Sequence, residues 1–476
     1  MVIARVTGLT ARAGDDELLA PVSFDLVAGK ITALVGPSGS GKTTAALALL
    51  GEVAPGVRLG GRVEIDGTLV VDDAPLPAAA SVRGRVVAYL PQDPGGALNP
   101  ARRIGSVLKE LSTVHNGPSP VDALAAAQLP LDASGLRRFP HQFSGGQRQR
   151  IALAQALACG PRILVLDEPS TGLDTITRRA LAQQIRSLAA QGLAILLLSH
   201  DHALVTALAS DTVTLGDFGA WAPSSHQTGV KRPCEQSTLE VTALSAHVPG
   251  RVLLDGVNLD LAAGGVLGIV GASGSGKTTL ARCIAGLHER YRGDVLLDGA
   301  RLPVLRKRNT EQRRRVQYVW QEVRSSFVDW TPVVDQVART AVLLRGLSTV
   351  EATAEAVDLL VRLGVDKATA ARTPAGLSGG QLQRAAVARA LLAAPDVLIC
   401  DEITSGLDPR ATTALLEVLS GLDCALLWIS HDLELVSTLA DRVAVLDHGR
   451  IVEIATPERL NSAAATELLA ARDLTT

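Results

Sequence analysis

The sequence contains no apolar run long enough to cross a lipid bilayer. Hydrophobic residues make up 47% of the 476 positions, but alanine, valine and leucine are spread over short segments. None of these segments reaches the roughly 18 consecutive apolar residues that a membrane-spanning helix needs. The residues from Met1 onward also lack the pattern of a secretory signal and continue directly into a strand-like segment. We therefore expect a cytoplasmic protein that is soluble or bound peripherally to a membrane.

Cysteine is scarce, and no two cysteines have the spacing of a metal site. The five cysteines are scattered along the chain at positions 159, 234, 283, 400 and 424. Without a Cys-x-x-Cys pair they match neither a zinc site nor an iron–sulfur cluster. Cys159 and Cys400 stand in apolar segments, which predicts that they pack in the core of a protein kept in a reducing compartment.

The sequence also lacks an excess of charge of either sign. A formal net charge of −2 argues against binding to nucleic acid through neutralisation of its phosphates. One basic cluster occurs, at residues 306–315. We interpret this cluster as the solvated face of a helix rather than as a binding patch.

One set of short motifs occurs twice, in the same order and at a nearly constant offset. The offsets are 235 residues between Lys42 and Lys277, 234 between Ser144 and Ser378, 234 between Glu168 and Glu402, and 231 between His200 and His431. Chance does not plausibly produce four such matches in register. The chain is therefore predicted to contain two copies of one module, each long enough to enclose its own core.

The first motif is a glycine-rich loop that ends in Gly-Lys-Thr, between a strand-like and a helix-like segment. Its glycines allow backbone N–H groups to surround the β- and γ-phosphates of a nucleotide at a helix N-terminus, while the lysine supplies a positive charge. The hydroxyls of Thr43 and Thr278 suit Mg²⁺. Taken alone, the loop is equally typical of kinases, GTPases and motor ATPases. The predicted nucleotide contacts are Gly36, Ser38, Gly39, Gly41, Lys42, Thr43 and Thr44 in the first copy, and Gly271, Ser273, Gly274, Gly276, Lys277, Thr278 and Thr279 in the second.

Two adjacent acids follow an apolar strand in each copy. Asp167 and Asp401 end these strands, where a carboxylate can hold a metal ion directly or through water. Glu168 and Glu402 come next and are predicted to polarise the attacking water. The alternative, that the acids only cap the following helix, does not explain two acids at this place in both copies.

A histidine follows another apolar strand in each copy. Continuous apolar strands indicate a parallel sheet that is buried on both faces. His200 and His431 should therefore lie at the same sheet edge as the acids and reach the γ-phosphate. A histidine that stands alone at such a position is more often structural, but its pairing with the other motifs favours a catalytic role.

A Ser-Gly-Gly-Gln turn that opens a helix is the motif that discriminates between families. With it, nearly the whole chain resembles the ATP-binding-cassette (ABC) superfamily. The first copy carries this resemblance at residues 36–43, 92, 144–147, 166–168, 172–174 and 200, and the second copy repeats the set. The resemblance implies an α/β fold of two tandem P-loop NTPase domains, each with a RecA-like parallel-sheet core and antiparallel β and helical subdomains. The helical subdomains would occupy about residues 104–127 and 333–363.

In that superfamily two domains meet head to tail, and each ATP lies between the phosphate loop of one domain and the Ser-Gly-Gly-Gln turn of the other. ATP binding would close the pair and hydrolysis would release it, with Mg²⁺ as the metal. The resemblance adds Gln92, Ser144, Gly145, Gly146, Gln147 and Asp174, and Gln321, Ser378, Gly379, Gly380, Gln381 and Asp408, to the ATP contacts, and Gln92 and Gln321 to the metal contacts. Both halves keep every one of these positions, which predicts two competent sites.

Within the superfamily the chain resembles the ATPase subunits of peptide and nickel importers. Residues 92–100 and 139–144 carry this likeness, whereas residues 321–324 diverge from it. It implies a location at the cytoplasmic face of the bacterial inner membrane. The implied partners are two integral-membrane permease subunits, whose coupling helices dock on the helical subdomains, and an extracytoplasmic substrate-binding protein. Nucleic acid is not an implied partner.

Two other functions occur in the same superfamily. A soluble tandem ATPase that acts on ribosomes would carry a long, charged, helical linker, whereas the linker here is short and rich in proline and serine. A DNA-repair ATPase would carry zinc-binding cysteine insertions, which are absent from the sequence. We place the first domain at residues 1–220, the linker at 221–238 and the second domain at 239–476.

One departure from the superfamily concerns the base of the nucleotide. An aromatic ring usually lies under adenine, upstream of the phosphate loop. At that place the first half offers only residues near Ala13, and the second half offers His247. We hypothesise that the first site discriminates weakly between bases.

Overall fold

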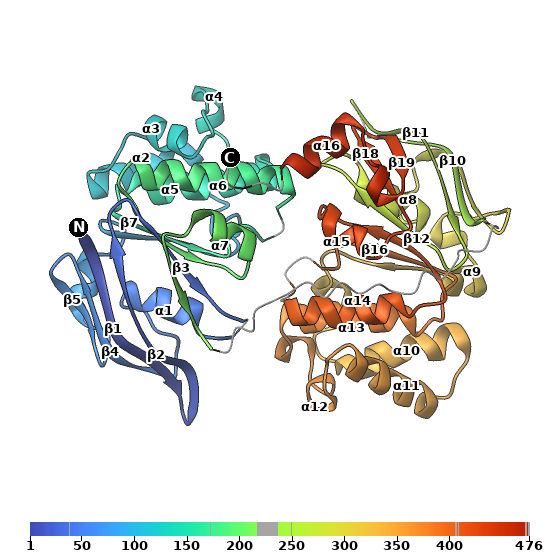
Figure 1. Ribbon diagram of the computed structural model, residues 1–476, viewed down its shortest axis with the longest axis horizontal. Helices are drawn as coiled ribbons and strands as arrows, with labels where there is room; N and C mark the ends of the chain where they lie inside the picture. The colour runs from blue at the N-terminus through green and yellow to red at the C-terminus, as the bar shows by residue number, and fades with distance from the viewer. Residues whose placement is uncertain are drawn as a thin grey trace. The chain divides into compact units, whose positions relative to one another are not determined.

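The computed structural model describes residues 1–37, 39–171, 173–216, 237–248, 250–404, 407, 409–471 and 474. They group into two compact units, one within residues 1–173, 177–220 and 474–476, and the other within 174–176 and 221–473. Figure 1 colours the first unit mainly blue to green and the second mainly yellow to red. Of the predicted linker, only Ser237 and Thr238 are described, and they begin a strand. The three domain boundaries therefore stay predictions.

The central sheet of the first unit is parallel. Its strand order is β6 (Val87–Leu90), β7 (Ile163–Asp167), β8 (Ala194–Leu198), β3 (Ile31–Val35) and β9 (Asp211–Thr214). Successive side chains of β7 alternate between two cores, with Val165 in one and Leu164 and Leu166 in the other. Because both faces are covered, β7, β8 and β3 are largely apolar, as the sequence predicts.

An antiparallel sheet covers one face of this parallel sheet, with one helix in contact with both. Its strand order is β2 (Asp16–Val27), β1 (Val2–Ala13), β4 (Val57–Ile65) and β5 (Thr68–Asp72). Helix α1 (Lys42–Leu49), which follows the phosphate loop, contacts β2, β4 and β5 on one side and β8 on the other. The loop is thereby fixed at the carboxyl end of β3.

Helices cover the other face of the parallel sheet. They are α2 (Ile104–His115), α3 (Pro120–Ala126), α4 (Ala133–Leu136), α5 (Gly145–Ala158), α6 (Thr175–Ala190) and α7 (His202–Leu208). Helix α5, which opens at the Ser-Gly-Gly-Gln turn, contacts α2, α3 and β6. The helical segment predicted at about 104–127 is therefore confirmed, with α2 and α3 packed on the helix of the turn.

The second unit repeats this arrangement. Its central sheet runs β15 (Val316–Val319), β16 (Val397–Asp401), β17 (Ala425–Ile429), β12 (Val266–Val270), β18 (Arg442–Asp447) and β19 (Arg450–Ala455), and its antiparallel sheet runs β11 (Arg251–Ala262), β10 (Ser237–Val248), β13 (Tyr291–Leu297) and β14 (Ala300–Arg301). Its helices are α8 (Lys277–Ile284), α9 (Thr310–Arg315), α10 (Val333–Arg345), α11 (Thr349–Arg362), α12 (Lys367–Ala370), α13 (Gly379–Leu391), α14 (Pro409–Ser420), α15 (Leu433–Ser437) and α16 (Ala463–Ala470). The predicted helical segment at 333–363 is confirmed as α10 and α11. Strand β19 pairs antiparallel to β18 and belongs to the C-terminal extension that follows the second histidine.

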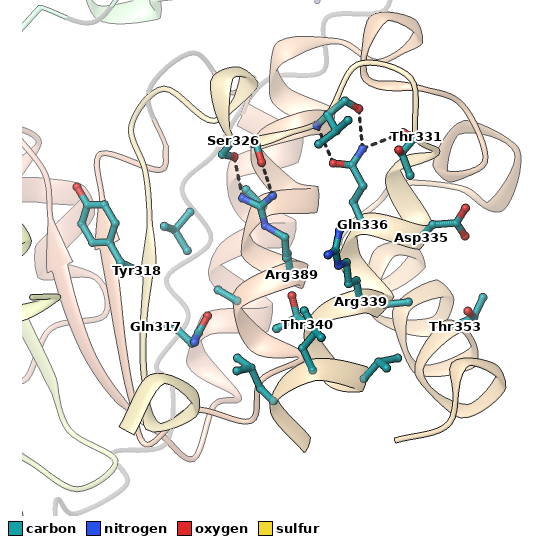
Figure 2. A pocket seen from close by; sticks show the side chains of 18 of the residues that line it. Gln317, Tyr318, Ser326, Thr331, Asp335, Gln336, Arg339, Thr340, Thr353 and Arg389 are labelled. Atoms are coloured by element: carbon teal, nitrogen blue, oxygen red, sulfur yellow. Dashed lines mark hydrogen bonds between the residues drawn. The ribbon is translucent and has the colours of Figure 1, made fainter. Parts of the chain in front are cut away.

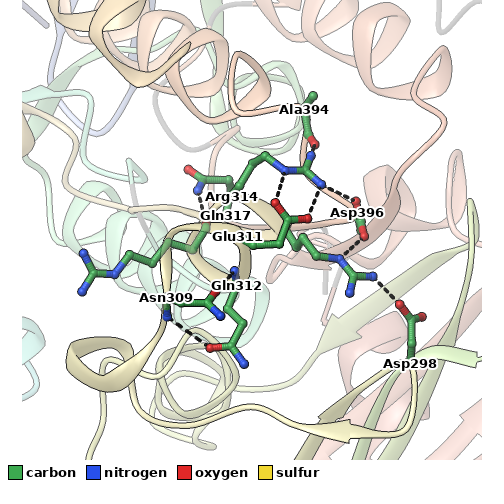
Figure 3. A network of polar contacts seen from close by, with 10 residues as sticks. Asp298, Asn309, Glu311, Gln312, Arg314, Gln317, Ala394 and Asp396 are labelled. Carbon is green, nitrogen blue, oxygen red and sulfur yellow. Dashed lines mark hydrogen bonds and ion pairs between the residues drawn. The ribbon is translucent and has the colours of Figure 1, made fainter. Parts of the chain in front are cut away.

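The basic cluster at residues 306–315 is held in part by acids of the same unit. Arg315 forms ion pairs with Asp298 and Asp396, and Arg314 donates to Glu311 Oε1 at 2.9 Å. Figure 3 shows Arg314 beside Glu311 in this network. The side chains of the two arginines are only about a quarter exposed (23% and 25%). These two arginines are therefore less solvated than we expected, and their ion pairs join α9 to the neighbouring sheet and loop.

The cysteines in the cores behave as the sequence predicts. Cys159 is 7% exposed and Cys400 is fully buried, and burial raises the pKa of the Cys400 thiol well above its usual value. Cys234 lies outside the described residues. In the part of the chain that the structure describes, no helix is both long and apolar enough to cross a membrane.

Candidate functional site

In both units the phosphate-loop lysine is the first residue of a helix and is buried. Lys42 begins α1 and is 8% exposed, and its Nζ donates to the carbonyl oxygens of Gly36 (2.6 Å) and Pro37 (3.1 Å). Lys277 begins α8 and is 6% exposed, and its Nζ donates to the carbonyl oxygens of Gly271 (2.7 Å) and Ala272 (3.0 Å). Burial lowers the pKa of Lys277. Each loop thus encloses a positive charge.

The N-termini of α1 and α8 present backbone amides without a side-chain cap. The residues that precede the helices, Gly41 and Gly276, have φ of +88° and +109°, which only glycine adopts readily. The Oγ atoms of Ser40 and Ser275 are buried and have no hydrogen-bond partner in the structure. A helix N-terminus without a side-chain cap, a buried ammonium and an unpaired hydroxyl fit an anion such as a nucleotide phosphate.

The predicted metal-binding acids lie directly beside the phosphate loops. Asp167 ends β7 and is 5% exposed, and its Oδ2 accepts a hydrogen bond from Thr43 Oγ1 at 2.9 Å. Asp401 ends β16 and is fully buried, and the contact from Thr278 Oγ1 is 3.3 Å long. Burial raises the pKa of the Asp401 carboxyl. The structure thus brings each predicted threonine, in the first turn of a helix, together with the predicted aspartate at the end of a strand.

In the first unit the glutamate, histidine and lysine of the motifs converge. The Nδ1 atom of His200 lies 2.8 Å from Glu168 Oε2, and this hydrogen bond raises the pKa of His200. Lys42 Nζ lies 3.7 Å from Glu168 Oε1. Glu168 has φ of +49°, a backbone conformation that a non-glycine residue adopts at a cost. Its N–H bonds to the carbonyl of Leu198, which holds it there.

The second unit brings the equivalent groups together with looser geometry. His431 Nδ1 lies 3.6 Å from Glu402 Oε1, and Glu402 has φ of +51°. Gln321 Nε2 donates to Glu402 Oε2 at 2.8 Å. Gln92, the equivalent residue of the first unit, is exposed at the end of β6.

Each Ser-Gly-Gly-Gln turn closes the N-terminus of its helix with a capping box. Ser144 Oγ accepts from the N–H of Gln147, and Gln147 Oε1 accepts from the N–H of Ser144. Ser378 and Gln381 repeat this pair of bonds. A Cβ added to Gly145, Gly146 or Gly379 would meet no atom within 4 Å, and one at Gly380 would meet Leu407 at 3.1 Å. The turns therefore offer open backbone surface.

The remaining predicted contacts lie near these groups or outside the described residues. Thr44 and Thr279 are the third residues of α1 and α8, and Gly39, Ser273 and Gly274 are in the loops. Asp174 directly precedes α6 and is 6% exposed. Ser38 and Asp408 lie outside the described residues.

Two tyrosines belong to the candidate sites although the sequence motifs do not include them. Tyr89 on β6 donates to Asp167 Oδ2 at 2.7 Å, and Tyr318 on β15 donates to Asp401 Oδ2 at 2.7 Å. Each stands three residues before the predicted glutamine contact, Gln92 or Gln321. This repeated spacing was the signal in the sequence, but only the pairing of neighbouring strands shows which acid the hydroxyl reaches.

Comparisons with known proteins match both halves of the chain. The family model described as ABC transporter matches residues 19–171 and 254–405. An uncharacterized ABC transporter ATP-binding protein, YejF of Escherichia coli K12, is 31% identical in an alignment 484 positions long that covers 91% of this chain and 90% of that protein. The glutathione import ATP-binding protein GsiA of the same strain is 30% identical in an alignment 514 positions long that covers 91% of this chain and 82% of GsiA. A dimeric structure of the bacterial ABC transporter cassette MJ0796 has 24% identity and a TM-score of 0.42, and covers 46% of this chain and 98% of that one.

Proposed function

Because this chain belongs to the ABC transporter family, we propose that it is the ATP-hydrolysing subunit that powers an importer of peptides or similar small solutes. The observation that carries the proposal is the complete motif set present twice in one chain: phosphate loop, strand-end acids, histidine and Ser-Gly-Gly-Gln turn. A relative that is matched over 82% of its length carries glutathione import in its name, and glutathione is a peptide. That name favours the importer over the ribosome-acting alternative, and peptide-like cargo over nickel.

The phosphate loops would hold the nucleotide. Their amides and the ammonium groups of Lys42 and Lys277 would contact the β- and γ-phosphates. The unpaired, buried hydroxyls of Ser40 and Ser275 support an oxygen-rich ligand in each loop. The Ser-Gly-Gly-Gln turn of one half would complete the site of the other half, as the resemblance to the superfamily implies.

The glutamate after each acidic strand would orient the attacking water. Glu168 and Glu402 would accept a hydrogen bond from it, and His200 and His431 would hold these carboxylates in place. The proposal is supported by the distance of 2.8 Å between His200 and Glu168. It is also supported by the left-handed backbone that both glutamates share, since such strain concentrates at functional sites.

Mg²⁺, when bound, supplies positive charge that offsets the charge developing on the phosphates. Thr43 with Asp167, and Thr278 with Asp401, would hold the ion, with Gln92 and Gln321 as further contacts. Among the described residues no group of three or more His, Cys, Asp or Glu side chains could hold a metal ion by itself. Proteins commonly bind Mg²⁺ through one or two carboxylates together with substrate phosphates and water, and one aspartate lies beside each phosphate loop.

A groove in the second unit supports docking of a permease helix. The groove has a volume of about 660 Å³ and is lined by residues of β15, α10, α11 and α13 and of the segment between β15 and α10. Figure 2 shows Arg389 and Gln336, two polar side chains that form hydrogen bonds within the lining of the groove. Arg389 donates twice to Ser326 at 2.7 Å, and Gln336 bonds both the N–H and the carbonyl of Val328. These bonds fix the groove in advance of any partner.

The rim of this groove is apolar and exposed, which suits an amphipathic helix. Val328 is 41% exposed and Leu343 is 61% exposed, and both line the groove. Trp330, two residues after Val328, is 83% exposed. Exposed apolar side chains gathered at a preformed groove are typical of helix recognition. We propose that a cytoplasmic helix of a permease subunit binds here.

The partners and location follow from this role. Two integral-membrane permease subunits and an extracytoplasmic substrate-binding protein would complete the transporter, and the chain would work at the cytoplasmic face of the inner membrane. The test is affinity purification of the full chain from native membranes in mild detergent, followed by mass spectrometry. Recovery of two polytopic permeases is expected. Recovery of ribosomal proteins without membrane subunits would overturn the importer.

A further inference from the structure

The tyrosine next to each strand-end aspartate occupies the same place in both units. On β6, Tyr89 pairs in register with Val165 of β7, two residues before Asp167. On β15, Tyr318 pairs with Ile399 of β16, two residues before Asp401. Each hydroxyl extends along the sheet to the Oδ2 atom of its aspartate at 2.7 Å. Both halves of the chain thus contain the same hydrogen bond between a tyrosine and a strand-end aspartate.

The direction of this hydrogen bond is fixed by the chemistry of the two groups. In both units the hydroxyl of the tyrosine donates and a carboxylate oxygen accepts. An ionised carboxylate has no proton of its own to donate and can only accept.

The same carboxylate also accepts from the threonine of the phosphate loop. In the first unit Thr43 and Tyr89 both donate to Oδ2 of Asp167. The carboxylate is therefore held from two sides, by the loop and by the neighbouring strand. A carboxylate held in this way cannot rotate without breaking a hydrogen bond.

We propose that Tyr89 and Tyr318 are positioning residues for ATP hydrolysis, each orienting the aspartate that holds Mg²⁺. The inference rests on the proposed function, since it needs Asp167 and Asp401 to contact the metal. Partners behind a metal-binding side chain fix its orientation, and their loss typically weakens metal affinity or activity by about 10- to 100-fold. The hydroxyls would act through the aspartates and would touch neither ATP nor the ion.

The competing explanation is that the tyrosines only pack. Tyr89 and Tyr318 both contribute to apolar clusters, and Tyr318 also stacks edge-on against Trp320 at 4.9 Å. Phenylalanine keeps the ring and removes the hydroxyl, so it separates the two explanations. The third tyrosine of the chain, Tyr291 on β13, is a matched control, because it is partly buried in the antiparallel sheet away from the acids.

The experiment compares nucleotide binding with and without metal in the full-length chain. ATP affinity would be measured by calorimetry in EDTA and in Mg²⁺ for the wild type, the Y89F/Y318F double variant and Y291F. We expect the double variant to bind ATP in EDTA as the wild type does. Its affinity gain from Mg²⁺ should fall by about 10-fold or more, while Y291F keeps the full gain.

Steady-state kinetics provide the second measurement. In the double variant the Mg²⁺ concentration for half-maximal hydrolysis should rise, and kcat should fall even at saturating ATP. If the double variant keeps the wild-type Mg²⁺ dependence within a factor of about two, the tyrosines only pack and the inference is wrong. If the wild type itself neither binds nor hydrolyses ATP, the proposed function fails instead.

Discussion

The Nδ1 atom of His200 lies 2.8 Å from the Oε2 atom of Glu168, at hydrogen-bond distance. The equivalent atoms of His431 and Glu402 are 3.6 Å apart. Each histidine reaches its glutamate from a neighbouring strand, so the pairing depends on the sheet rather than on nearness in the chain. The two candidate sites therefore share their groups but differ in how tightly those groups are held.

The pairing of His200 with Glu168 predicts how stability depends on pH. The hydrogen bond raises the pKa of His200 in the folded protein, so the folded state binds the proton more tightly than the unfolded chain does. The stabilisation is complete below the ordinary histidine pKa of about 6.5 and is lost as the pH rises through the folded value. Replacing His200 by Gln should therefore destabilise the protein more at about pH 5.5 than at about pH 9. Chemical denaturation at the two pH values measures this difference.

A double variant provides the control for that prediction. In E168Q the partner of His200 has lost its charge but keeps its shape. Adding H200Q to E168Q should change stability by nearly the same amount at both pH values. An undiminished pH difference in this second background would assign the effect to a group other than Glu168.

Both ATP sites are expected to turn over. Glu168→Gln should block hydrolysis at the first site and Glu402→Gln at the second, because an amide cannot take up a proton from the attacking water. Phosphate release should fall in each single variant by about half or more, and by about 10²-fold or more in the double variant. A single variant with full ATPase activity would contradict the symmetry of the two sites.

The buried lysines should control the number of nucleotides bound. Lys42→Ala removes the positive charge enclosed by the first loop, and Lys277→Ala removes that of the second. Calorimetric titration with ATP should give two sites for the wild type, one for each single variant and none for the pair. Two full-affinity sites in K42A would show that the first loop does not bind phosphate.

The groove on the second unit should control attachment to the permeases. Leu343→Glu places a charge on the exposed apolar rim, where it should reduce co-purification of permease subunits several-fold. The ATPase activity of the isolated chain should not change, because Leu343 is exposed on the rim of the groove and is not one of the candidate site residues. Val361→Glu is the control, since Val361 is 46% exposed in the same helical subdomain, and neither it nor its chain neighbours line the groove. Equal losses in both variants would place the docking surface elsewhere.

The first site should distinguish adenine from guanine weakly. Ala13 ends β1 and provides no ring for stacking, whereas His247 is exposed on β10 in the second unit. Stacking of a base on an aromatic side chain contributes about 1–3 kcal/mol. In K277A, which isolates the first site, ATP and GTP affinities should agree within about fivefold. A strong preference for ATP would contradict the hypothesis.

The sequence by itself determined the chemistry and the class of fold. Each motif is a short, continuous run whose spacing is fixed by local geometry, such as the glycines of the phosphate loop or Ser144 and Gln147 in one capping box. The apolar strands predicted the parallel sheet because a strand buried on both faces favours apolar side chains at nearly every position. Because the whole set of motifs occurs twice, the sequence also predicted two units.

Only the tertiary structure decided which of these groups meet. Tyr89 and Asp167 are 78 positions apart and touch because β6 lies beside β7. Lys42 approaches Glu168 because β3 and β7 both adjoin β8 and end at the same edge. A motif predicts which side chains stand at the end of a strand. It does not predict which other strand pairs with that strand in the sheet. That order is set by burial of the whole sheet between its two layers, a property of many residues distant in the chain.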